Sequence, residues 1–187
     1  MTEDLDRIFG VLYAGGTILY PTDTIWGIGC DATNETAVKK IFEIKKRPDA
    51  KSMIVLVDSE KMLFQYAGNF PDVALDIIRA SDKPITIIYP EVYGIANCLI
   101  AEDGSAGIRI TDDKFCVSII KKFSRPIVST SANLSGMPWP KSFKDIDTEI
   151  VKAVDYVVKW RQDDRSASKP SGIIKVWTDG SIKIIRE

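Results

Sequence analysis

The sequence predicts an α/β fold, with one twisted mixed β-sheet flanked by helices in a single domain over residues 1–187. Short apolar runs alternate with helical patterns along much of the chain, as is typical of α/β proteins. A hairpin pattern near the C-terminal end adds antiparallel pairing, so the sheet should be mixed rather than purely parallel. A chain of 187 residues suits one domain, and no internal repeat or linker divides it.

The N-terminal half begins with an amphipathic pattern, in which apolar residues recur at helical spacing over residues 2–13 and Gly15-Gly16 follows the end. Residues 17–20 read as a strand. Asn34 is a suitable cap for a helix that must stop near Arg47, because Pro48 disfavours its continuation. The elements expected next are a buried strand at 53–57, helices at about 60–66 and 71–79, and a strand at 85–89.

The C-terminal half continues with a strand at 106–110 that is interrupted by one charge, Arg109. A helix over 112–123 follows, with Asp112 as its expected cap. The remaining expected elements are a strand at 126–129, a helix from Ser142 to about 153, a strand at 156–160, a charged surface loop at 161–170, and a closing hairpin at 172–177 and 181–186.

The composition excludes several kinds of active site. The chain contains no histidine, so a Ser-His-Asp or Cys-His mechanism is impossible. Its three cysteines, Cys30, Cys98 and Cys116, lack Cys-x-x-Cys spacing, which argues against a zinc site or a disulfide framework. No apolar run approaches the roughly 20 residues that span a bilayer, and the N-terminus is acidic. We therefore expect a cytoplasmic protein with no membrane association.

Polar residues gather where the first strand ends, in Tyr20-Pro21-Thr22-Asp23-Thr24, shortly before Gly27 and Gly29. Pro21 cannot donate a ladder hydrogen bond, so the strand should stop there and Thr24 should project from its end. Strand ends are common ligand sites in α/β proteins. The alternative is a proline-initiated turn in which the Thr and Asp side chains satisfy the local backbone. In the ligand-binding interpretation, the Thr22 hydroxyl fixes the turn that presents Thr24.

Isolated cations and further hydroxyl-bearing strand ends complete the pattern. The cations are Lys45, Arg47, Lys51, Arg109 and Arg186, and the hydroxyl-rich segments are 129–136 and 168–172. Arginine and lysine beside hydroxyl groups suit phosphate or carboxylate oxygens. Each element also has a purely structural interpretation, either a solvated helix end or a capped turn. Together they predict a pocket for anionic ligands that lacks acid–base machinery.

With these residues in view, the chain resembles the YrdC family of threonylcarbamoyl-AMP synthases. Tyr20-Pro21-Thr22-Asp23-Thr24 with Gly27 and Gly29 is similar to the family's opening motif. Lys45-x-Arg47 with Ser131-x-Asn133 is similar to its split signature, and residues 129–136 are similar to its longest motif. The resemblance implies a sheet around a concave, positively lined groove. It also implies condensation of L-threonine, bicarbonate and ATP into threonylcarbamoyl-AMP and pyrophosphate.

The resemblance also implies roles for individual residues. Threonine would contact Thr24, Arg109, Ser129 and Ser171, with its carboxylate on Arg109. ATP would be held by Lys45, Arg47, Lys51, Ser131, Asn133 and Arg186, of which Lys45, Arg47, Ser131 and Asn133 would also act in catalysis. Mg²⁺ would enter with ATP and be held largely by triphosphate oxygens. Asp23 is a hypothetical carboxylate for orienting the amine or a metal-bound water. The product would pass to tRNA-modifying threonylcarbamoyl transferase machinery.

Three alternatives stay open. The chain departs from the family pattern at Ser52-Met53, Leu56, Ser81-Asp82-Lys83-Pro84 and Gly172, which leaves room for a YciO-like paralogue with weaker or different nucleotide chemistry. A second alternative is an RNA- or tRNA-binding module that uses Lys39, Lys40, Lys45, Lys46, Arg47 and Lys51, although the net charge of −1 disfavours it. The third is a transferase that acts on another carbamoyl adenylate.

Overall fold

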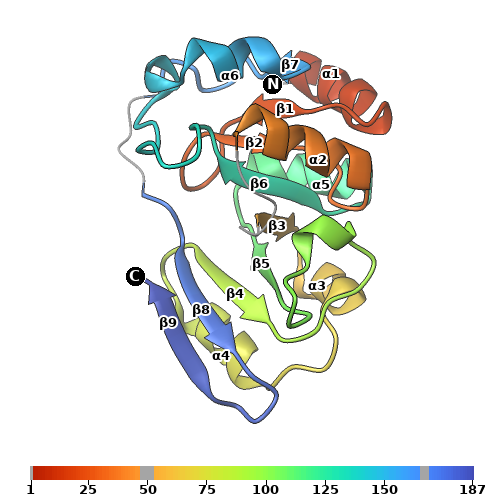
Figure 1. Cartoon of the computed structure of the whole chain (residues 1–187), viewed down its shortest axis with the longest axis vertical. Coiled ribbons are helices and arrows are strands. Elements are labelled where there is room, and N and C mark those ends of the chain that lie inside the picture. The colour runs from red at the N-terminus through yellow and green to blue at the C-terminus, as the bar shows by residue number, and fades with distance from the viewer. Residues whose placement is uncertain (1, 47–52, 165–168) are drawn as a thin grey trace.

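One mixed sheet runs through the molecule in the computed structural model, which describes residues 2–46, 53–164 and 169–187 (Figure 1). Within these residues the strands lie in the order β7-β1-β2-β6-β3-β5-β4-β8-β9. The β1/β7, β3/β5 and β4/β8 pairs are parallel, and the other pairs are antiparallel. The strands are β1 (Ile18–Tyr20), β2 (Gly27–Gly29), β3 (Ile54–Val57), β4 (Ile85–Tyr89), β5 (Ala106–Ile110), β6 (Ile127–Ser131), β7 (Tyr156–Val157), β8 (Gly172–Val176) and β9 (Ile182–Arg186).

Helices cover both faces of the sheet. They are α1 (Thr2–Tyr13), α2 (Glu35–Ile44), α3 (Glu60–Tyr66), α4 (Val73–Ala80), α5 (Lys114–Phe123) and α6 (Thr148–Ala153), with short 3₁₀ turns η1 (Asn97–Leu99) and η2 (Phe143–Asp145). Helices α1 and α5 pack in one apolar cluster, while α2, α3, α4 and α6 contribute to another. Neighbouring strand residues divide between the two clusters, since Leu19 joins one and Ile18 and Tyr20 join the other. The expected α/β class is therefore confirmed.

Several predicted elements are confirmed closely. Helix α1 spans residues 2–13 as expected, and the closing hairpin forms from β8 and β9. Asn34 caps α2, where its Oδ1 accepts a hydrogen bond of 3.1 Å from the Ala37 amide. This helix ends at Ile44, and Lys46 adopts a positive φ of 49°. Lys45 is the C-cap, and its amide still donates to the Ile41 carbonyl at 3.0 Å.

One strand was not predicted, and three boundary predictions are wrong. Gly27–Gly29 is a strand, because the short segment pairs with β1 on one side and β6 on the other. The cap of α5 is Asp113 rather than Asp112, since its Oδ1 accepts from two helix amides. The strand predicted at 126–129 continues to Ser131, and the one predicted at 156–160 ends at Val157.

The fifth difference lies between Ser142 and Ala153, where one helix was expected. Ser142 and Asp145 instead form a capping box around η2. The buried Ile146 then has an extended backbone, and Asp147 starts α6 by accepting from the Glu149 amide at 2.8 Å. A second capping residue close behind the first thus divides the segment into two short turns of helix.

Candidate functional site

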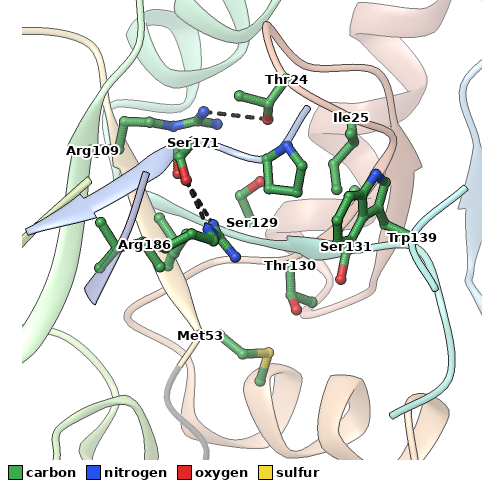
Figure 2. A pocket seen from close by; sticks show the side chains of 14 residues that line it. Thr24, Ile25, Met53, Arg109, Ser129, Thr130, Ser131, Trp139, Ser171 and Arg186 are labelled. Carbon is green, nitrogen blue, oxygen red and sulfur yellow. Dashed lines mark hydrogen bonds between the residues drawn. The ribbon is translucent and has the colours of Figure 1, made fainter. Parts of the chain in front are cut away.

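An open pocket gathers six of the residues predicted to bind ligands (Figure 2). They are Thr24, Arg109, Ser129, Ser131, Ser171 and Arg186. The pocket has a volume of about 720 Å³, which includes solvent at its mouth. Its walls come from the β1–β2 loop, from β2, β3, β5 and β6, and from the β8–β9 hairpin. Segments far apart in the sequence therefore converge on one site.

The β1–β2 loop presents Thr24 through a directed chain of hydrogen bonds. The Thr22 hydroxyl donates to the Ile25 carbonyl at 2.8 Å, and it accepts from the Thr24 amide at 3.1 Å. Since the single Thr22 proton is already donated, the Thr24 hydroxyl must donate to Thr22 across their 2.9 Å contact. Arg109 in turn donates to Thr24 Oγ1 at 3.3 Å. The expectation that Thr22 fixes the turn is confirmed.

Arg109 is almost fully buried beside Asp23. Their side chains are 2% and 10% exposed, and Arg109 Nη2 lies 3.1 Å from Asp23 Oδ1. The contact is an ion pair without aligned hydrogen bonding, because Asp23 Oδ1 and Arg109 Nε each lack a hydrogen-bond partner among the described residues. Burial raises the pKa of Asp23 more than the neighbouring Arg109 lowers it. The structure thus gives Asp23 the position of a counter-ion, and its hypothetical role toward an amine or a metal-bound water stays untested.

The closing hairpin supplies Ser171 and Arg186 from the opposite side. The Ser171 hydroxyl shares a 2.8 Å hydrogen bond with Thr86 on β4, and Arg186 donates to the Ser171 carbonyl through Nε at 3.0 Å and Nη2 at 2.8 Å. A bulge makes Ile185 an extra residue, so that Arg186 lies opposite Ile173, which also lines the pocket. Burial and the nearby charge of Arg109 lower the pKa of Arg186.

The split signature is only partly assembled in the pocket wall. Lys45 is 1% exposed, and its ammonium group donates to the Ser131 carbonyl and, at 2.6 Å, to the Asn133 carbonyl. Asn133 itself turns its amide toward the Leu134 and Met137 carbonyls. Through these hydrogen bonds Lys45 and Asn133 hold in place the backbone at the end of β6 and just after it. Arg47 and Lys51, which were predicted to bind ATP, lie outside the described residues.

The described lysines that the RNA-binding alternative would use are either paired with carboxylates or buried. Lys39, Lys40 and Lys46 form ion pairs with Glu35, Asp155 and Glu149 at 3.3, 3.3 and 2.8 Å. Lys45 is buried. The last two cations of that set, Arg47 and Lys51, lie outside the described residues. Pairing with carboxylates reduces the attraction of these exposed lysines for phosphate.

The described residues offer hydroxyls and cations, rather than carboxylate clusters, to a cofactor. No group of three or more Asp, Glu or Cys side chains in the described parts of the chain could hold a metal ion. A divalent ion would fit here only if a substrate brought most of its ligands, as the triphosphate of ATP does. Across the same residues, no helix is long and apolar enough to cross a membrane.

Sequence reasoning missed several residues of the pocket wall, above all Ile25, Met53, Thr130 and Trp139. Met53 is one of the departures from the family pattern, and Leu56, another departure, is a fully buried core residue. Trp139 is 48% exposed although tryptophan usually packs in cores. Its position between Pro138 and Pro140 was a usable signal, because prolines on both sides restrict the backbone around an exposed ring.

Comparison with known proteins identifies the family. The Sua5/YciO/YrdC family model, described as telomere recombination, matches residues 10–187. A putative threonylcarbamoyl-AMP synthase from Methanocaldococcus jannaschii is 38% identical, over 91% of this chain and 79% of its own. A threonylcarbamoyl-AMP synthase from Xanthomonas euvesicatoria is 34% identical, over 84% of this chain and 86% of its own.

Solved structures agree on the fold. Sua5 from P. abyssi complexed with L-threonine aligns with a TM-score of 0.81 at 24% identity, covering 92% of this chain. The present chain spans only 50% of that Sua5 chain. E. coli YciO aligns with a TM-score of 0.85 at 21% identity, covering 100% of this chain and 90% of its own. On the match over residues 10–187 and these relatives, the chain belongs to the Sua5/YciO/YrdC family.

Proposed function

We propose that the protein is a threonylcarbamoyl-AMP synthase, which condenses L-threonine, bicarbonate and ATP into threonylcarbamoyl-AMP and pyrophosphate. The observation that carries the proposal is the convergence of Thr24, Arg109, Ser129 and Ser171 with Ser131 and Arg186 in one pocket. Relatives at 34% and 38% identity bear this name, and a solved relative binds L-threonine. The adenylate would be consumed by a tRNA-modifying threonylcarbamoyl transferase.

The buried guanidinium of Arg109 is suited to the threonine carboxylate. Its Nε lacks a hydrogen-bond partner among the described residues, so a carboxylate oxygen can satisfy it. An unsatisfied buried donor costs roughly 1–3 kcal/mol, and ligand binding would recover part of this. Thr24 and Ser129, both nearly buried, add hydroxyl groups on the same wall. These contacts would fix the amino acid so that its nitrogen faces bicarbonate.

The reaction needs orientation and charge neutralisation more than a proton relay. The neutral amino group of threonine attacks the bicarbonate carbon and gives up one N–H proton to the departing hydroxide, which leaves as water, so that a carbamate forms. A carbamate oxygen then attacks the α-phosphorus of ATP, and the bond to pyrophosphate breaks. Arg186 and the hydroxyls of Thr130 and Ser131 would hold phosphate oxygens in line, which supports catalysis by positioning and electrostatics. Mg²⁺ bound with ATP would supply further neutralisation of the triphosphate.

A pyrophosphate-release assay tests the proposal. Pyrophosphate and an AMP-containing product should form only when threonine, bicarbonate and ATP are all present, and each omission should reduce release to background. Arg109→Ala should abolish release at threonine concentrations that saturate the wild type. Threonine-independent release would instead indicate a YciO-like protein with other nucleotide chemistry, and turnover with another amino acid would indicate a different carbamoyl adenylate. RNA binding that falls steeply with salt, without any turnover, would support the RNA-binding alternative.

A further inference from the structure

Tyr20 reaches across the sheet from β1 to β6. Its ring passes over Gly29 of β2, where an added Cβ would lie 2.7 Å from the ring. Its phenol then donates to the Val128 carbonyl on β6 at 3.1 Å. The side chain is fully buried, and Tyr20 is not among the described residues that line the pocket. Tyr20 therefore contacts the strand that carries Ser129 without lining the pocket itself.

The phenol also fixes the direction of the Ser129 hydroxyl. The side chains of Tyr20 and Ser129 form a hydrogen bond. Because the only phenolic proton is donated to Val128, Ser129 must donate in this bond and Tyr20 must accept. Burial raises the pKa of Tyr20 well above its usual value, and the hydrogen bond from Ser129 lowers it by less, so the phenol keeps its proton at neutral pH. The Ser129 oxygen is left with lone pairs for the pocket that it lines.

Thr24 has the same polarity as Ser129. Its hydroxyl donates to Thr22, and its side chain also lines the pocket (Figure 2). The two hydroxyl systems approach each other over Gly27, where an added Cβ would lie 3.3 Å from Ser129 Oγ and 3.8 Å from Thr22 Cγ2. The pocket wall therefore holds two neighbouring oxygens whose protons are already engaged within the protein.

We propose that Tyr20 is a positioning residue, which holds the Ser129 oxygen as a hydrogen-bond acceptor for the amino group of threonine. The inference rests on the proposed function, because it concerns the step in which that amino group attacks bicarbonate. A neutral amine has two N–H bonds and one lone pair. Ser129 and Thr24 accept the two N–H groups, which leaves the lone pair free to face the bicarbonate carbon. Such orientation before the reaction is what the condensation needs.

Equilibrium binding tests the inference, with ATP present, bicarbonate omitted, and L-threonine and (R)-3-hydroxybutanoate as paired probes. The second probe keeps the carboxylate, hydroxyl and methyl groups of threonine and lacks only the amine. Tyr20→Phe should raise the Kd of L-threonine about three- to tenfold, the effect of one hydrogen bond, and leave the Kd of (R)-3-hydroxybutanoate unchanged. In a Ser129→Ala background, Tyr20→Phe should have no further effect, because it acts through the Ser129 hydroxyl.

Tyr156→Phe is the matched control. Tyr156 also donates a phenolic proton, to Asp4 Oδ1 at 2.8 Å, and it is not among the described residues of the pocket wall. This variant loses a comparable hydrogen bond at a distance from the site, so it should bind L-threonine like the wild type. Thermal melting of every variant shows whether it is folded at the temperature of the binding measurement.

Three results would overturn the inference. They are an unchanged Kd of L-threonine in Tyr20→Phe, an equal loss of affinity for both probes, and a full additional loss in the Ser129→Ala background. These failures are distinct from failure of the proposed function. If the wild type makes threonylcarbamoyl-AMP while Tyr20→Phe binds L-threonine normally, only the role of Tyr20 is wrong. If Tyr20→Phe loses affinity for L-threonine alone but the wild type makes no adenylate, the role of Tyr20 stands and the synthase assignment falls.

Discussion

Arg109, in the wall of the pocket, forms a buried ion pair with Asp23. The two charges are removed from water, so each depends on the other for compensation. The pair still leaves Arg109 Nε without a protein partner within the described residues. Asp23 can therefore compensate the guanidinium in the free protein while one donor remains available for a ligand.

A double-mutant cycle on this pair is the first prediction. Asp23→Asn and Arg109→Met should each destabilise the protein by about 3–5 kcal/mol, because each leaves a buried charge unpaired. The double variant should lose clearly less than the sum of the two, since no uncompensated charge remains. Urea unfolding at neutral pH measures all four free energies. If the losses of unfolding free energy in the two single variants simply add in the double variant, the two side chains do not stabilise each other.

At the scale of single residues, the side chains that line the pocket were easier to predict from the sequence than the residues that support them. Hydroxyls and cations at strand ends are visible in the sequence because they interrupt apolar runs. The partners of Arg109 and Lys45 are not, since both pairings join segments that are distant in the chain: Arg109 with Asp23, and Lys45 with the carbonyls of Ser131 and Asn133. Such contacts depend on tertiary placement.

At the scale of elements, the hairpin of β8 and β9 is the part that completes the pocket. Within the described residues it pairs with the rest of the sheet only through β4, and every residue of β9 is exposed. Lys175 on β8 gives it a second attachment, an ion pair with Asp103 in the turn before β5. The attachment should matter to the positions of Ser171 and Arg186.

The Asp103–Lys175 pair leads to a pH prediction. Hydrogen bonds from Lys175 and then Ser105 lower the pKa of Asp103 to about 2. Since the native state favours the ionised form, the pair stabilises the fold above the ordinary pKa of 3.8, and this contribution disappears as the pH falls toward 2. Asp103→Asn should therefore lower the melting temperature slightly at pH 7, as expected for a partly exposed pair, and converge with the wild type near pH 2.

Lys175→Gln provides the matched comparison for this prediction. It removes the other member of the pair, so its loss of stability should follow the same pH profile. A difference from the wild type that stays constant between pH 7 and 2 would mean that the effect does not come from ionisation of Asp103.

Helix α2, with strong local signals, was predicted well, and strand β2, which depends on pairing alone, was missed. Helix α2 has an asparagine cap, an apolar face and a following proline, all readable in the sequence. Strand β2 has only Gly-Ile-Gly, and glycine disfavours strands. It is a strand because β1 and β6 pair with it, and Gly29 is needed there, since a Cβ would lie 2.6 Å from the Val128 carbonyl oxygen and 2.7 Å from the Tyr20 ring.

At the scale of the whole molecule, the site joins two parts of one sheet. The β1–β2 loop and β6 form one wall of the pocket, and β8 and β9 form the other. These last two strands lie at one end of the sheet (Figure 1). A ligand that touches Thr24, Ser171 and Arg186 together must connect these parts. Binding should therefore restrain the β8–β9 hairpin, which joins the rest of the sheet through β4.

Hydrogen exchange tests this connection. Saturating L-threonine with ATP should slow exchange of the β8 and β9 amides by about 100-fold when free ligand is 100 times its Kd, if local opening of the hairpin releases the ligand. Helices α1 and α5 pack in the apolar cluster that includes Ile18 and Tyr20 and contains no residue of β8 or β9. The exchange rates of their amides through local opening should change little. D-threonine is the control ligand. Equal slowing in all elements would indicate global stabilisation without a link through the hairpin.

The buried Lys45 has a practical consequence for following the opening of the molecule. Its ammonium group is held on the carbonyls of Ser131 and Asn133, while Lys46 next to it is 66% exposed at its side chain. Amine-acylating reagents should therefore label Lys46 quickly and Lys45 only when the end of β6 separates from α2. Mass spectrometry gives the labelling rates of the two adjacent lysines, and the rate of Lys45 relative to that of Lys46 reports how often that separation occurs. Equal labelling rates under native conditions would contradict the buried position of Lys45.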